Sequence, residues 1–308
     1  MNLAASFAEL QPKDKAPHSA RVLNTWIAMA ERQLASDAGR LGWLVASTIA
    51  TAALQQAVDA GGTPLFLLKG GTLLQHVLPQ LSRATTDLDG LVRCDIDEFI
   101  VSLDRVLAQA WGPLALRRGP LEEILVPHRQ VRPRRFDITL QLKGITWRRI
   151  QVEISPDEGN AGAYVEEIAP PSLIGFGLPT PDRLVGLSMR YQIAQKVHAS
   201  TDPHDPPTDH NDRARDAVDL LLLRDLATAT GHPTPSEIRG AIEDIFNTRA
   251  LEAMATAGEP RTWPARLEAH PHWAVAYEYA AKSANIDKPL NDTISEVNAW
   301  LDQIERSQ

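Results

Sequence analysis

The feature that most constrains this chain is a glycine turn that joins a short apolar run to an amphipathic helix. Residues 64–68 are apolar and of strand length, residues 69–72 read Lys-Gly-Gly-Thr, and apolar residues then recur at helical spacing up to Leu78. Adjacent glycines permit a tight turn with bare backbone amides, and the start of a helix favours negative charge. The pattern predicts a phosphate-binding turn, with candidate nucleotide-binding residues Lys69, Gly70, Gly71 and Thr72.

Two aspartates, Asp87 and Asp89, follow this helix. Because side chains alternate along a strand, both carboxylates lie on one face, about 6.6 Å apart along the backbone. Hard cations such as Mg²⁺ (or Mn²⁺) take oxygen ligands of this kind and bridge to substrate phosphates. The turn and the two aspartates together predict metal-dependent chemistry on a nucleoside triphosphate. A Walker-type loop is disfavoured, since no Lys-Ser or Lys-Thr pair follows a second glycine at the required spacing.

A third carboxylate, Glu153, lies in the strand-like run 147–154. Alternation puts the two isoleucines and the valine of this run on one face and Glu153 on the opposite, open face. A glutamate in this position either faces solvent or completes a two-metal site with the two aspartates. The order of the motifs favours the second interpretation.

Composition limits the class of protein. The chain has 308 residues, of which 44% are hydrophobic and 23% charged, so it can bury the core of an ordinary globular protein. Its single cysteine, Cys94, excludes an internal disulfide and fits a reducing compartment. No apolar run reaches the length of a membrane span, and residues 1–15 lack the pattern of a secretory signal. We therefore expect a cytoplasmic protein that makes no contact with a membrane.

The charge is unevenly distributed. The net charge is −8, yet the segment 117–149 carries nine basic and three acidic residues, a local net charge of +6. A basic face on an acidic protein suits nucleic-acid phosphates. Exposed residues on ordinary strands would give the same pattern, and both interpretations stay open.

The rest of the chain reads as helices around a run of strands. Helical periodicity covers residues about 19–59 and the segment from Asp95 to Gly112. The strands expected after it are 121–126, 134–142 and 147–154. Helices are then expected from Thr180, from near Asp212, and over 235–257, 272–284 and 291–306.

This order of elements predicts an α/β (α+β) fold with a mixed sheet. Prolines near residue 180 mark a boundary between the strands and the later helices. The expected division is an N-terminal helical segment (1–60), a sheet domain (61–178) and a helical domain (179–308).

The helix expected near residue 212 carries Asp216 and Asp219 on one face, three residues apart. The two carboxylates either face a site, with Arg213 or Arg215 in support, or pair with those arginines along the helix surface.

A polar loop before this helix contains residue types that bind transition metals, namely His198, His204, Asp205, Asp209 and His210. Their irregular spacing favours a solvated loop over a metal site.

Taken in order, these motifs resemble those of the AbiEii-type nucleotidyltransferase toxins, the toxin half of bacterial toxin–antitoxin pairs. The likeness spans Phe66 to Leu222. Its elements are Lys69-Gly70-Gly71-Thr72, Arg83, Thr86-Asp87-Leu88-Asp89, the Glu153 strand, Lys196, and the helix with Arg213, Asp216, Asp219 and Leu220. Their order makes the set more specific than any single motif.

The resemblance implies a nucleotidyltransferase-type mixed sheet flanked by helices, with a helical C-terminal domain. It implies transfer of a nucleotide from an NTP to an acceptor, with RNA, in particular the tRNA 3′ end, as the known substrate class of relatives. It also implies a cognate antitoxin protein. Many relatives open the first motif with Gly-Ser, whereas this chain has Gly70-Gly71-Thr72, so Thr72 is expected to supply the hydroxyl.

The expected mechanism is phosphoryl transfer by positioning and electrostatics. The amides of the turn and Thr72 donate to the β- and γ-phosphates, whereas Lys69 either joins them or packs beside the site. Lys196 neutralises the triphosphate, with Arg190 as a second candidate, and Arg213 supports the nucleotide. The expected catalytic residues are Asp87, Asp89 and Glu153 as metal ligands, together with Lys196 and with Asp216, which orients Lys196 or the nucleotide.

Two other function classes stay open. One is a catalytically silent nucleotidyltransferase-fold binding protein or antitoxin, against which the intact Asp87, Asp89 and Glu153 argue. The other is a small-molecule nucleotidyltransferase, favoured if the segment 117–149 does not touch nucleic acid.

Overall fold

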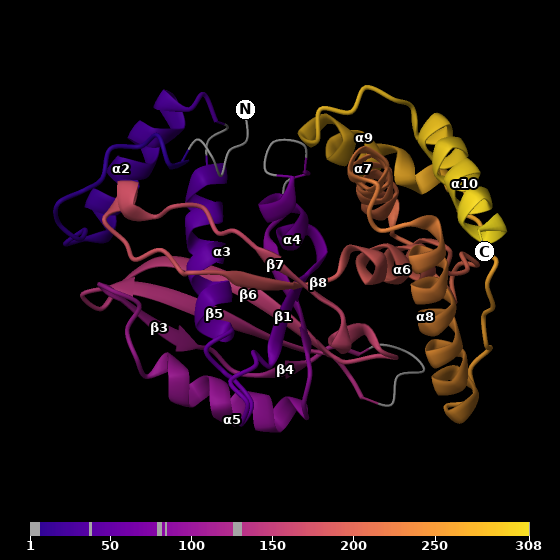
Figure 1. The fold of residues 1–308 in the computed structure, drawn as a ribbon, viewed down its shortest axis with the longest axis horizontal. Coiled ribbons are helices and arrows are strands. Elements are labelled where there is room, and N and C mark those ends of the chain that lie inside the picture. The colour runs from indigo at the N-terminus through magenta and orange to yellow at the C-terminus, as the bar shows by residue number, and fades with distance from the viewer. Residues whose placement is uncertain (1–6, 37–38, 79–81, 84, 126–130, 308) are drawn as a thin grey trace.

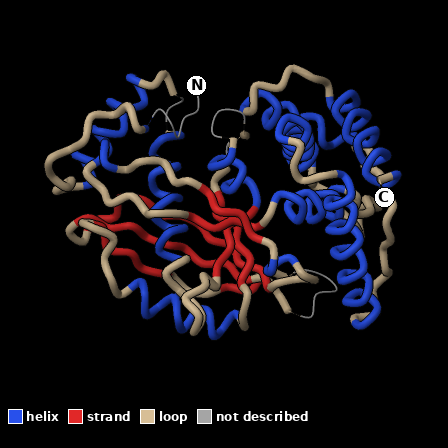
Figure 2. Tube along the Cα trace, viewed as in Figure 1, coloured by secondary structure: helices blue, strands red, loops and turns tan. Residues whose placement is uncertain are grey.

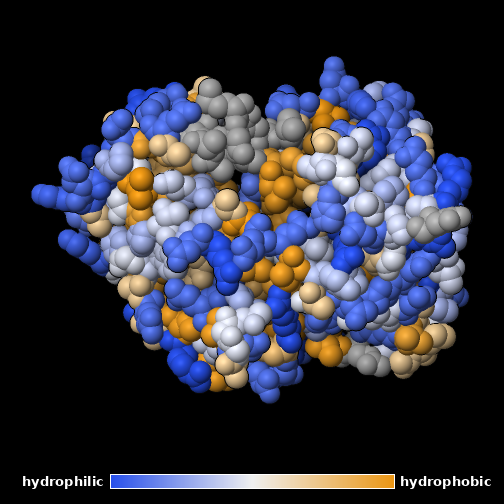
Figure 3. Space-filling view, in the orientation of Figure 1, coloured by the Kyte–Doolittle hydropathy of each residue, from blue (hydrophilic) through white to orange (hydrophobic). Residues whose placement is uncertain are grey.

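The structure, a computed structural model, describes residues 7–36, 39–78, 82–83, 85–125 and 131–307. Figure 1 shows two parts side by side, a sheet with its helices on the left and a group of helices from the C-terminal half on the right. The strands are confined to the first part (Figure 2). The surface is mostly hydrophilic on the face shown in Figure 3, with apolar residues gathered along the middle of that face.

The described helices are α2 (Ala20–Gln33), α3 (Arg40–Leu54), α4 (Gly70–Val77), α5 (Ile96–Leu107), α6 (Met189–Ser200), α7 (Ala214–Thr230), α8 (Pro235–Ala255), α9 (Ala274–Ser283) and α10 (Leu290–Arg306). The described strands are β1 (Phe66–Lys69), β2 (Asp87–Val92), β3 (Leu114–Arg118), β4 (Glu122–Glu123), β5 (Arg134–Leu142), β6 (Ile145–Pro156), β7 (Val165–Ile168) and β8 (Leu184–Leu187). None of the described helices is long and apolar enough to cross a membrane.

The eight strands form one mixed sheet, in the order β3-β5-β6-β2-β1-β8-β7, with β4 paired to β5. β2 is parallel to β6 and β1 is parallel to β8, whereas the other pairs are antiparallel. The mixed sheet with flanking helices confirms the predicted fold class. The catalytic candidates of β2 and β6 therefore lie on adjacent strands in the middle of the sheet.

The two faces of the sheet differ because apolar and polar residues alternate along β5 and β6. Phe136, Ile138 and Leu140 of β5 are buried, and so are Ile150 and Val152 of β6. α5 packs against β3, and α3 packs against β6. Alternation directs the polar residues of these strands to the opposite face, which we call the open face.

Two expectations for helices differ from the structure, and a third is confirmed. The segment 19–59 is two helices, α2 and α3, separated before Gly39, whose φ of +84° caps α3. The helix expected from Thr180 begins at Met189, because Leu184–Leu187 is the buried strand β8. The helix expected near Asp212 is confirmed, because α7 begins two residues later, at Ala214.

The strand expectations hold for β5 and β6, but the expected strand 121–126 is reduced to the two residues of β4, and residue 126 lies outside the described residues. β3 and β7 were not predicted. The sheet continues to Leu187, past residue 178, and the division into three domains stays a prediction.

Candidate active site

The glycine turn lies where β1 passes into α4, as predicted. Gly70 has a φ of +69°, and a Cβ at this position would collide with the carboxylate of Asp89. A side chain is therefore excluded both by the backbone conformation and by the neighbouring aspartate. The amide of Gly70 donates to Oε1 of Gln192 on α6, at 3.1 Å. The turn thus contacts both the sheet and the helical half of the chain.

The three predicted carboxylates lie together on the open face. β2 and β6 pair in parallel with Asp89 opposite Glu153 and Asp87 opposite Gln151. The Gln151 Nε2 atom donates to Asp87 Oδ1 and to Glu153 Oε1, at 3.3 Å in each case. The register of two strands therefore brings together residues that are more than sixty positions apart in the sequence.

Asp89 has an unusual protonation equilibrium. Burial raises the pKa of its carboxyl to about 6, with the charges of Glu153 and Asp87 adding to the rise and those of Lys69 and Lys196 opposing it. The rise therefore comes chiefly from desolvation of the carboxylate. A cation bound there would favour the ionised form of Asp89.

Glu153 is held by an arginine that the sequence did not single out as a site residue. Arg135, its cross-strand neighbour on β5, donates from Nε at 2.8 Å and from Nη2 at 2.5 Å to Glu153 Oε1. Both side chains are partly exposed, at 41% for Arg135 and 29% for Glu153. The pair can therefore exchange partners with little desolvation cost.

Lys196 enters the site from α6 in a buried charge network. Its Nζ lies 2.8 Å from Asp216 Oδ1 and 2.7 Å from Asp219 Oδ2, both on α7. Arg83 donates from Nε and Nη2 to the two carboxylate oxygens of Asp219, at 3.0 Å each. Asp219 is fully buried. Its pairing with Arg213 and Arg215 along a helix surface, one of the two interpretations of the sequence, is therefore wrong.

The network keeps its members charged. Burial lowers the pKa of Lys196, but the carboxylates of Asp216 and Asp219 outweigh it and raise that pKa above its ordinary value. Burial raises the pKa of Asp216, but Lys196 and Arg213 outweigh it and hold that pKa below its ordinary value. Lys196 is therefore a permanent cation beside the glycine turn, and Asp216 positions it.

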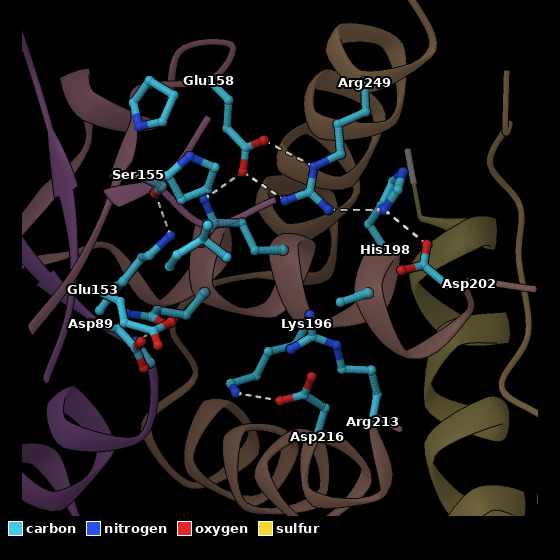
Figure 4. Close-up of a pocket in the computed structure, with 18 of the residues that line it drawn as sticks. Asp89, Glu153, Ser155, Glu158, Lys196, His198, Asp202, Arg213, Asp216 and Arg249 are labelled. Atoms are coloured by element: carbon cyan, nitrogen blue, oxygen red, sulfur yellow. Dashed lines mark hydrogen bonds and ion pairs between the residues drawn. The ribbon is translucent and has the colours of Figure 1, made fainter. Parts of the chain in front are cut away.

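Many of these residues line one cavity of about 540 Å³, but the predicted metal ligand Asp87 is not among its lining residues. The predicted site residues that line it are Lys69, Gly70, Gly71, Asp89, Glu153, Lys196, Arg213 and Asp216. Figure 4 shows Asp89 and Glu153 on one side, Lys196 and Asp216 below, and Glu158, Arg249 and His198 on the opposite side. We call this space the active-site cavity.

Lys69 packs beside the carboxylates, one of the two positions expected for it. Its Nζ lies 2.6 Å from the Ser155 hydroxyl of β6, and its charge lowers the pKa of Asp89.

Two predicted nucleotide-binding residues do not line the cavity. Thr72 is fully buried and donates its hydroxyl to the backbone carbonyl of Asp87 at 2.7 Å. The guanidinium of Arg190 stacks on Tyr164, 3.7 Å from the ring centroid. Thr72 therefore supports the strand that carries the aspartates, and Arg190 is engaged elsewhere.

The residues on the far side of the cavity were not predicted from the sequence. Arg249 of α8 donates to both carboxylate oxygens of Glu158, at 2.9 and 2.7 Å, and its Nη1 lies 2.9 Å from His198 Nδ1. Gln195 also donates to Glu158, at 2.8 Å. Glu158 and Arg249 are 91 residues apart, so no local spacing signals their pairing.

The histidine-rich loop, which the sequence predicts to be solvated, lies beside two further histidines. The rings of His204 and His210 lie beside those of His270 and His272, with centroids 4.3 to 6.4 Å apart. Within the described ranges, no three His, Cys, Asp or Glu side chains are already arranged to hold a metal ion. The three carboxylates of the open face are not so arranged either: Asp87 contacts Gln151, and Glu153 contacts Gln151 and Arg135.

Comparison with known proteins identifies the family. A family model described as "Nucleotidyl transferase AbiEii toxin, Type IV TA system" matches residues 52–302. That segment contains every candidate residue of the cavity. Comparison with curated proteins gives no significant match.

Two solved structures are similar over most of their length. MenT4, the nucleotidyltransferase toxin Rv2826c from Mycobacterium tuberculosis H37Rv, has 17% identity, covering 90% of this chain and 98% of that chain with a TM-score of 0.47. JHP933 from Helicobacter pylori has 12% identity, covering 88% and 93% with a TM-score of 0.43.

Proposed function

The chain belongs to the AbiEii family of nucleotidyltransferase toxins, and we propose that it moves a nucleotide from an NTP to the 3′ end of an RNA, with tRNA as the acceptor class. The observation that carries this proposal is the convergence of the glycine turn, Asp89, Glu153 and Lys196 on one cavity. Anion-binding amides and cations suit the triphosphate, and the carboxylates suit the reacting end.

The reaction would depend on Mg²⁺ or Mn²⁺ held by Asp87, Asp89 and Glu153. The donor set fits, because hard divalent cations prefer carboxylate oxygens and the three residues lie on adjacent strands of the open face. Bound there, the metal would supply charge neutralisation for the triphosphate and its leaving group. Both hydrogen bonds from Arg135 to Glu153 go to Oε1, so an ion held by that oxygen would have to displace Arg135, whereas one held by Oε2 would not.

The chain's own groups would bind the triphosphate from the opposite side. The Gly70 amide now donates to Gln192 Oε1, and a phosphate oxygen would take the place of this carbonyl oxygen. Lys69, Lys196 and Arg213 line the same cavity and would neutralise the phosphates. Asp216 would keep Lys196 charged and aimed at them.

The biological setting follows from the family. Its members are toxins of type IV toxin–antitoxin systems, so we propose a cognate antitoxin as the protein partner. We propose the cytoplasm as the site of action, because tRNA and nucleoside triphosphates are there and the lone cysteine suits a reducing compartment.

Incubation of the purified protein with total tRNA, Mg²⁺ and each labelled NTP in turn tests this function. We expect label in RNA with the intact protein, none when EDTA replaces Mg²⁺, and none with Asp87→Ala. Absence of label in RNA with every NTP would contradict the proposal. Label in a small-molecule acceptor instead would identify the small-molecule transferase.

A further inference from the structure

Some arginines of the basic segment 117–149 contact other parts of the protein, and the others lie on the open face of the sheet. Arg118 donates to Asp104 of α5 at 2.8 and 2.7 Å, and Arg148 lies against Gly42 of α3, so both serve the helix-covered face. Arg132 and Arg134 pair with Glu123, at 3.1 and 3.0 Å. Arg129 lies outside the described residues.

The remaining strand arginines share the open face with the carboxylates. Arg135 stands in register with Glu153 and Asp89 across three strands. We call these three residues the carboxylate row. Farther along the same strands, Arg117, Thr139 and Arg149 stand in register across β3, β5 and β6. We call these three the arginine row.

The two rows are at a defined separation. Arg149 is four residues before Glu153 on β6, and four residues of strand span about 13 Å. Because the offset is even, both side chains project from the same face. Between the rows lie Asp137, Gln151 and Asp87, again in register.

The arginine row is available to a ligand. Arg149 is 68% exposed, and its ion-pair partner is Asp137 at 3.6 Å, itself 38% exposed. Such an exposed pair contributes little and exchanges easily. Arg117 is exposed too, and it has no ion-pair partner among the residues that the structure describes. Both guanidinium groups can therefore take an anionic ligand at low cost.

We propose that the open face binds the single-stranded 3′ end of the acceptor RNA, with the arginine row on backbone phosphates and the terminal hydroxyl at the carboxylate row. This inference rests on the proposed function and adds the path of the acceptor. A polyanion whose reactive end must reach Asp89 and Glu153 needs cations at a distance from those carboxylates, and Arg117 and Arg149 are placed there. Thr139 and Gln151 offer neutral polar contacts to the strand.

Contacts of this kind position an RNA without reading its sequence, since phosphates carry no base identity. The arginine row therefore predicts acceptor affinity that is strongly salt-dependent and tolerant of sequence.

The test measures RNA binding without NTP. The probe is a short single-stranded RNA with a 5′-fluorescein and a free 3′ hydroxyl, followed by fluorescence anisotropy over a salt series. We expect the double variant Arg117→Gln/Arg149→Gln to bind about tenfold more weakly or worse, because two charge-assisted hydrogen bonds are lost. The slope of log affinity against log salt falls by roughly 1.4, about 0.7 for each phosphate contact on a single strand.

The matched control is Arg183→Gln/Arg306→Gln, which removes the same charge from exposed positions outside the open face. It should bind the probe as the intact protein does, and thermal unfolding of both double variants shows whether they are folded. Equal affinity of both double variants for the probe would overturn the inference. The inference would also be overturned if Arg117→Gln/Arg149→Gln bound RNA normally and instead lost binding to an acidic protein partner.

The outcome is separable from that of the transfer reaction. If the row variant loses RNA binding and the intact protein adds no label to RNA, the proposed function fails while the RNA-binding face stands. If label enters RNA but the row variant binds normally, the function stands and this path for the acceptor is wrong.

Discussion

The two charged clusters of the cavity contrast in how they are satisfied. The Lys196–Asp216–Asp219–Arg83 network is buried, and its ion-pair contacts are 2.7 to 3.0 Å long. The carboxylate row is partly exposed, holds an aspartate with a raised pKa, and leans on one exchangeable arginine. The buried Lys196 network therefore holds one arrangement, whereas the partly exposed carboxylate row can exchange partners. Lys196 is therefore already charged and held in place, whereas the carboxylate row would rearrange around a metal ion under the proposed function.

The largest expected effect on activity is at Asp89. Asp89→Asn should lower nucleotide transfer by about a thousandfold, because a group that neutralises transition-state charge through the metal is lost. Its melting temperature should be unchanged or higher, since the buried charge is removed. Thermal unfolding and transfer rates are measured beside Asp225→Asn, an exposed aspartate of α7. A large loss of stability would contradict the assignment of Asp89 to the exchangeable cluster.

The opposite behaviour is expected of Asp219. Asp219→Asn should destabilise the protein by about 3–5 kcal/mol, because Arg83 and Lys196 are left buried without their carboxylate. Denaturant unfolding measures the effect, and Asp225→Asn on the same helix is again the control. A variant as stable as the control would show that the network does not hold the two halves of the site together.

Asp89 of the carboxylate row should also titrate at an unusual pH. The folded pKa of Asp89 is raised to about 6 from an ordinary value near 4. The contribution of Asp89 to folding stability is therefore largest at low pH and is lost as the pH rises through about 6. Metal binding needs the ionised carboxylate, so the affinity for a metal ion should rise over the same pH range. We expect a carboxyl titration near pH 6 in metal-free protein by carbon NMR.

Asp87→Asn removes one repelling charge and should move that titration to lower pH. The same midpoint in both proteins would show that Asp87 does not act on Asp89.

The smallest expected effect is at Thr72. Thr72→Val removes one buried hydrogen bond to the Asp87 carbonyl and should cost about 1 kcal/mol of stability. Thr72→Ser keeps the hydroxyl and is the matched control. An unchanged stability together with a raised KM for NTP would instead restore the phosphate-binding role expected from sequence.

The sequence predicts the elements whose evidence is local. The turn at Gly70, the aspartates two residues apart and the alternation around Glu153 each lie within one short segment. Pairing of β2 with β6 then brings the carboxylates together, as expected. Asp216 was singled out by its helical spacing from Asp219, whereas Lys196 was named through the family resemblance.

What the sequence could not show depends on distant partners. Glu153 meets Arg135 through strand register, and the Gly70 amide meets Gln192 from 122 residues away. The role expected of Thr72 was replaced because a nearer acceptor, the Asp87 carbonyl, takes its hydroxyl.

The strand β8 shows how local evidence misleads. Leu184 and Leu187 have helical spacing after a proline that suits a helix start, yet all four residues of β8 are buried. A strand covered on both faces reads as a continuous apolar run rather than an alternation. Gly186 was the contrary signal, because a Cβ there would collide with Leu73 and Ile168.

The most direct test of the central claim compares two acceptors, native tRNA and tRNA whose 3′-terminal ribose has been oxidised with periodate. With Mg²⁺ and the preferred labelled NTP, we expect label in native tRNA only, and none in either acceptor with Asp89→Asn. Equal labelling of native and oxidised tRNA, or labelling that survives Asp89→Asn, would contradict transfer to the 3′ hydroxyl at this site.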